Sequence, residues 1–137
     1  MLGLNVYVCQ CFIFICRRVS LGHVQVKVKL TSPTTNKSVT TESLVDTGAM
    51  FTTIPKSLSE ELKLPSVAKR RVTTASGEEE LTESYLLIAS LDEKTMTPVL
   101  MSEKLNRVLV GALTLEALAL KVDPRTGKLE KTELLLL

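Results

Sequence analysis

The sequence lacks most of the residues and motifs that several large enzyme classes require. It contains one histidine, His23, and no Gly-x-Ser-x-Gly nucleophile elbow. A Ser-His-Asp or Cys-His enzyme would have to use that single histidine, which we expect to face solvent at the start of a strand. The three cysteines, Cys9, Cys11 and Cys16, all precede residue 17. Their odd number and position provide no disulfide framework for the rest of the chain, which favours a reducing compartment.

Metal, nucleic-acid and membrane binding are also poorly supported. The cysteine spacing, taken together with His23, fits no common zinc pattern, so we expect neither a metal nor a cofactor. The formal net charge is only +2, and aromatic residues make up 4% of the chain. That charge is too small to indicate an anionic partner, and so few aromatics provide no stacking platform for bases. We therefore expect no nucleic-acid partner.

The N-terminal residues differ from the rest of the chain. Residues 1–16 are strongly apolar and are followed by Arg17 and Arg18. This run is shorter than the roughly 20 residues of a spanning helix, and it lacks the features of a secretory signal. We interpret residues 1–18 as an N-terminal extension and residues 19–137 as one domain, in a cytoplasmic protein. A short membrane anchor formed by residues 1–18 remains an open alternative.

The remainder is predicted to be mainly β. Val24, Val26 and Val28 alternate with polar residues, which is the period of a half-buried strand. A capping-box spacing after Pro55 predicts a first short helix, and residues 113–119 predict a second. The other predicted strands are residues 38–45, 50–54, 70–74, 81–88, 97–101, 108–110 and 129–137, with turns at residues 31–37, 75–80, 91–95 and 123–127.

The stretch Leu-Val-Asp-Thr-Gly-Ala at residues 44–49 is the strongest indication of chemistry. Asp46 directly follows the apolar end of a predicted strand and begins a tight turn, where Gly48 lets the backbone bend. A carboxylate at such a place is costly to ionise unless it is hydrogen-bonded or has a chemical role. Downstream, Arg-Val-Leu-Val-Gly-Ala-Leu at residues 107–113 is a second apolar strand that ends in a glycine.

An apolar strand into Asp-Thr-Gly-Ala, followed later by an apolar strand into Gly and a short helix, resembles the retropepsins, the retroviral-type aspartic proteases. The resemblance extends from about Val24 to the C-terminus. It implies a closed β-barrel with one or two short helices, one lobe per chain, and a homodimer that cleaves polypeptide substrates. It also implies that the apolar residues 134–137 pair with a second copy.

The resemblance further implies roles for individual residues. Two Asp46 carboxylates, one per subunit, would activate a water, while Thr47, Gly48 and Ala49 complete the loop. The second apolar-Gly motif is Leu109, Val110 and Gly111, and the tip of a substrate-covering flap is Ala75, Ser76, Gly77 and Glu78.

The chain departs from the family at one pair of positions. Retroviral members usually carry an acid and an arginine where this chain has Met50 and Ala112. Both partners of that ion pair are missing together, so no unpaired buried charge remains. Two interpretations stay open: an active homodimeric endopeptidase, or a catalytically weak or inactive module for dimerisation or peptide binding.

Overall fold

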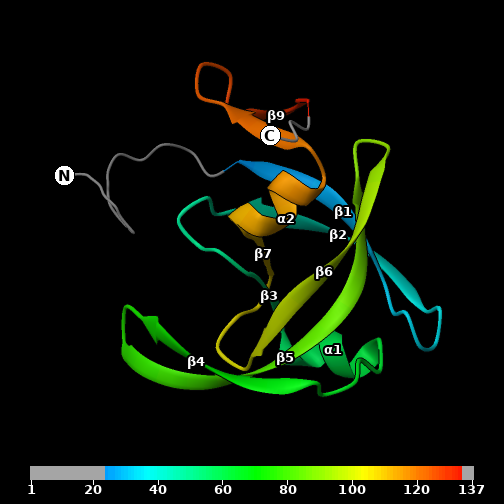
Figure 1. Cartoon of the computed structure of the whole chain (residues 1–137), viewed down its shortest axis with the longest axis vertical. Coiled ribbons are helices and arrows are strands. Elements are labelled where there is room, and N and C mark those ends of the chain that lie inside the picture. The colour runs from blue at the N-terminus through cyan, green and yellow to red at the C-terminus, as the bar shows by residue number, and fades with distance from the viewer. Residues whose placement is uncertain (1–23, 134–137) are drawn as a thin grey trace.

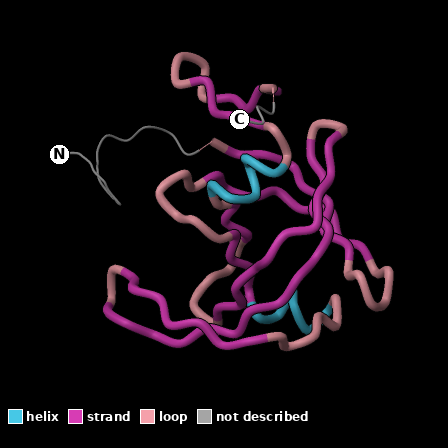
Figure 2. Tube along the Cα trace, in the orientation of Figure 1, coloured by secondary structure: helices cyan, strands magenta, loops and turns pink. Residues whose placement is uncertain are grey.

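A computed structural model describes residues 24–133 (Figure 1), and within that range strands dominate over two short helices (Figure 2). The strands are β1 (Gln25–Thr31), β2 (Ser38–Val45), β3 (Thr52–Pro55), β4 (Ala68–Thr74), β5 (Gly77–Ser90), β6 (Glu93–Ser102), β7 (Val108–Val110), β8 (Leu120–Asp123) and β9 (Lys128–Lys131). The helices are α1 (Lys56–Glu61) and α2 (Ala112–Ala117).

Six of the strands form a closed barrel. The hydrogen-bonded order is β1-β2-β7-β3-β6-β5, and β5 pairs back onto β1. β4 lies outside this ring and pairs only with β5 among the described strands, so the two form a long hairpin that projects from the barrel (Figure 1). The predicted closed β-barrel with two short helices is therefore confirmed.

The barrel interior is filled by residues that alternate along the strands. In β1, Val26, Val28 and Leu30 point inward, as the alternation predicts, and Leu30 is completely buried. Burial of each such side chain contributes about 1.5–3 kcal/mol to folding. Leu62, directly after helix α1, is buried in this core. No side chain caps the first turn of α1, contrary to the predicted capping box.

Two turns are tighter than the sequence predicts. β4 and β5 are joined by Ala75–Ser76 alone, and Gly77 begins β5 with φ of 119°. β5 and β6 are joined by two residues with positive φ, Leu91 at 50° and Asp92 at 68°, so residues 93–95 belong to a strand. Positive φ at both central residues matches the twist of a two-residue hairpin. Leucine rarely adopts this conformation, which explains why the sequence suggested a longer turn.

The C-terminal strand prediction is corrected in its length, because β9 ends at Lys131. His23, residues 1–18 and residues 134–137 lie outside the described residues, so the predictions made for them stay predictions. No helix within residues 24–133 has the length and apolar character needed to cross a membrane.

Candidate functional site

The two motifs singled out in the sequence lie side by side. β2 and β7 are parallel neighbours, with Val45 opposite Val110. Both strands therefore end at the same edge of the sheet, and Asp46 follows one while Gly111 follows the other. The Asp46 amide donates a hydrogen bond to the Val110 carbonyl at 2.9 Å. This parallel pairing brings together residues 65 positions apart (111 − 46).

Asp46 lies at the start of an ordered turn. The Gly48 amide donates to Asp46 Oδ1 at 3.0 Å, and the Ala49 amide donates to the Asp46 carbonyl at 3.1 Å. Asp46 is half-buried, while Thr47 and Gly48 are exposed. The turn fixes the direction of the carboxylate and leaves it within reach of a second molecule. A carboxylate held this way can accept a proton or a hydrogen bond.

The segment after the turn is held against the start of α2. The Ala112 amide donates to the Ala49 carbonyl at 2.8 Å, and the Leu113 amide donates to the Met50 carbonyl at 3.0 Å. Gly111 allows this approach, since a Cβ there would lie 2.6 Å from the backbone carbonyl carbon of Phe51. The conformation of the Asp46 loop therefore depends on a glycine at position 111.

Three buried threonine hydroxyls stabilise this arrangement from inside the protein. No local sequence pattern predicted them. Thr114 Oγ1 on α2 lies 2.6 Å from Thr52 Oγ1 and 2.8 Å from Thr97 Oγ1. Thr52 Oγ1 also accepts a hydrogen bond from the Gly111 amide at 3.1 Å. The chain of hydroxyls ties β3, β6 and α2 to the second motif. The only local signal is a threonine between two leucines in α2.

Two exposed apolar side chains lie close to the Asp46 turn, one in the same loop and one in α2. Met50 is 67% exposed and Leu113 is 38% exposed. The backbone hydrogen bond between Leu113 and Met50 keeps these residues together. Met50 and Leu113 therefore form an exposed apolar surface beside the Asp46 turn.

The β4–β5 hairpin and the Asp46 loop, residues 46–51 between β2 and β3, project toward the same side of the molecule in the view of Figure 1. Ala75, Ser76, Gly77 and Glu78 are all exposed at the hairpin tip. The base of the hairpin contacts the end of the loop, because Arg70 Cζ lies 4.9 Å from the centre of the Phe51 ring. The hairpin and the loop therefore contact each other through Arg70 and Phe51. The sequence alone gave no indication of a role for Phe51.

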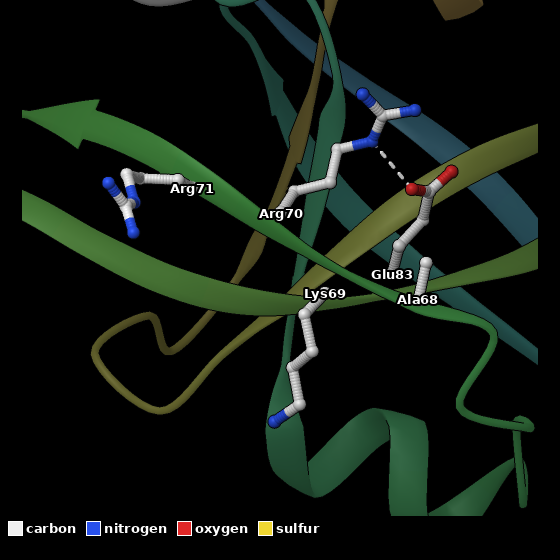
Figure 3. Close-up of a pocket in the computed structure, with 5 residues that line it drawn as sticks. All are labelled: Ala68, Lys69, Arg70, Arg71 and Glu83. Carbon is white, nitrogen blue, oxygen red and sulfur yellow. Dashed lines mark hydrogen bonds and ion pairs between the residues drawn. The ribbon is translucent and has the colours of Figure 1, made fainter.

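Arg70 also pairs with a nearly buried carboxylate. Its Nε donates to Glu83 Oε1 at 2.6 Å, and the Glu83 side chain is 4% exposed (Figure 3). Arg70 is therefore held by the hairpin, although it lies in the basic run Lys69-Arg70-Arg71. Within residues 24–133, no three His, Cys, Asp or Glu side chains gather in a way that could hold a metal ion.

Comparison with known proteins agrees with this geometry. A family model described as aspartyl protease matches residues 24–112, a range that includes both motifs and the hairpin. No curated protein sequence matches the chain significantly.

Several solved structures share the fold. The EIAV protease, solved with the inhibitor HBY-793, aligns with a TM-score of 0.58 at 17% identity, over 77% of this chain and 99% of that one. A retropepsin-like aspartic protease from Rickettsia conorii aligns with a TM-score of 0.56 at 22% identity, over 74% and 77%. The foamy viral protease-reverse transcriptase, bound to an RNA/DNA hybrid, aligns with a TM-score of 0.52 at 19% identity. That match covers 68% of this chain but only 11% of the viral protein.

Proposed function

The chain belongs to the aspartyl protease family and has the retropepsin-like fold, and from this premise we propose that it is a homodimeric aspartic endopeptidase. In this proposal each active site contains two Asp46 carboxylates, one from each subunit. The observation that carries the proposal is the ordered Asp46 turn, where the Gly48 amide orients the carboxylate at a surface that a second molecule can reach.

The need for two chains follows from the aspartates available. The sequence has three, Asp46, Asp92 and Asp123. Asp92 lies in the β5–β6 turn, and Asp123 at the end of β8 pairs with Arg125. Neither follows a strand beside the Asp46 loop. A second carboxylate facing Asp46 therefore has to come from another copy, with the active site on the two-fold axis.

The chemistry would use one proton shared by the two carboxylates. Like charges at contact distance do not both ionise, so one group stays protonated. The ionised group takes a proton from a water as that water attacks the peptide carbonyl. The protonated group donates a hydrogen bond to the carbonyl oxygen and stabilises the tetrahedral intermediate.

The β4–β5 hairpin would act as a flap over the substrate. A peptide bound between the hairpin and the Asp46 loop is shielded from bulk water, which strengthens the polar interactions of the reaction. Gly77 supports this role, because its φ of 119° at the hairpin tip is a conformation that glycine adopts most readily. Exposed Met50 and Leu113 are suited to contact the partner subunit or an apolar substrate side chain.

The test is cleavage of a denatured protein by the purified full chain across acidic pH, with and without pepstatin. The matched control is Asp46→Asn, which keeps the size of the side chain but can neither accept the water's proton nor share one. We expect pepstatin-sensitive cleavage by the wild type and none by the variant. Equal activity in the variant would exclude the mechanism. Peptide binding without cleavage by the wild type would instead favour an inactive binding module.

A further inference from the structure

The guanidinium of Arg70 is held in place by the protein, but only some of its N–H groups donate hydrogen bonds to it. The side chain of Arg70 is 50% exposed, whereas that of its partner Glu83 is 4% exposed. The Phe51 ring lies against one side of the guanidinium, 4.9 Å from Cζ. An ion pair on one side and an aromatic ring on the other restrict the orientation of this planar group.

Most donors of this guanidinium remain available. An arginine has five N–H donors, and within residues 24–133 the only hydrogen bond that Arg70 makes through its side chain is from Nε to Glu83. The two terminal amino groups are therefore free of protein acceptors in the described part of the chain. A pair of parallel N–H groups fits a carboxylate in the bidentate geometry that gives arginine its strongest hydrogen bonds.

The location of Arg70 connects it to the proposed active site. Arg70 contacts Phe51, which lies five positions after Asp46 (51 − 46). Figure 3 shows Arg70 and Glu83 projecting from the same face of the hairpin, while Lys69 projects from the opposite face. The open cavity beside them has a volume of about 360 Å³, and its lining contains three basic residues and one acidic residue: Ala68, Lys69, Arg70, Arg71 and Glu83.

From this geometry we infer that Arg70 is a specificity-determining residue that selects polypeptides with an aspartate or glutamate near the scissile bond. The inference rests on the proposed protease function. A peptide held between hairpin and loop passes the guanidinium, whose terminal amino groups then bind the substrate carboxylate. Glu83 keeps the guanidinium oriented and acts as a positioning residue.

The experiment compares cleavage sites in a mixed peptide library, identified by mass spectrometry, for the full-length wild type and three variants. Arg70→Met alone would leave Glu83 buried without its partner, which can destabilise the fold. The double variant Arg70→Met, Glu83→Gln removes both charges and keeps the side-chain volumes. Arg125→Met is the matched control, since Arg125 lies in the turn between β8 and β9, is 89% exposed and does not line the cavity.

We expect the wild type to prefer an acidic residue at one fixed distance from the cleaved bond, by about tenfold in kcat/KM over the corresponding amide. This preference should shrink with added salt, disappear in the double variant and persist in Arg125→Met. Cleavage by the wild type without acidic preference, or an unchanged preference in the double variant, would overturn the inference and leave the protease function standing. Absence of cleavage by every form would remove the protease function and the inference together.

Discussion

Replacement of Gly111 by alanine tests whether the second motif controls the Asp46 loop. The added Cβ would lie 2.6 Å from the carbonyl carbon and oxygen of Phe51 and 2.7 Å from the Met50 oxygen. All three are backbone atoms, so relief to a normal carbon contact requires the loop to move by about 1 Å. Overpacking of this kind costs about 1–3 kcal/mol in the free energy of unfolding.

The loop movement should affect activity more than stability. A displacement of about 1 Å at a reacting group lowers turnover by roughly 100-fold. Gly127→Ala is the control. Gly127 has φ of 69° and no atom within 4 Å of an added Cβ. The variant therefore strains the backbone without a steric clash, at a position outside the Asp46 loop. Thermal unfolding and cleavage rate should be measured on both variants. A Gly111→Ala protein that turns over substrate as fast as the wild type would refute the reasoning.

The remaining predictions concern the supporting structure. Thr114→Val should lower the free energy of unfolding by about 1–3 kcal/mol, because it leaves the buried hydroxyls of Thr52 and Thr97 without their shared partner. Thr114→Ser keeps the hydroxyl and should retain most of the wild-type stability. Equal denaturant midpoints for both variants would contradict this. Gly77→Val forces a branched residue into φ of 119° at the exposed hairpin tip, where a backbone strain of about 1–3 kcal/mol should lower the melting temperature and the altered tip should lower turnover. Unchanged turnover in the folded variant would remove the flap assignment. Deletion of residues 134–137 should weaken dimerisation, since each leucine that a partner subunit covered would contribute about 1.5–3 kcal/mol. A truncated chain that sediments as a dimer at low concentration would argue against it.

The sequence was most informative where a local pattern carries the structure. Alternation of Val24, Val26 and Val28 predicted β1, and the apolar runs that end before Asp46 and Gly111 predicted the ends of β2 and β7. Strand alternation and glycine turns act over a few residues, so they can be read without knowledge of the fold. The barrel itself was predicted from the family resemblance, because strand pairing across the chain leaves no local signal.

Contacts between distant segments account for what was missed. No local pattern marks Arg70, which the hairpin places between Phe51 and Glu83. Thr114 looked like an ordinary helix residue until α2 packed it beneath β3 and β6. In both cases the partner is set by the barrel and not by sequence spacing.

The most direct test of the central claim is a mixing experiment between the wild type and Asp46→Asn. If each active site needs one Asp46 from each of two chains, random exchange with an equal amount of the variant should leave about half of the wild-type chains paired with each other. The cleavage rate at a fixed wild-type concentration should then fall to about half, and further as more variant is added. A rate that stays constant as the folded variant exchanges into dimers would show that one chain suffices, and would contradict the two-chain active site.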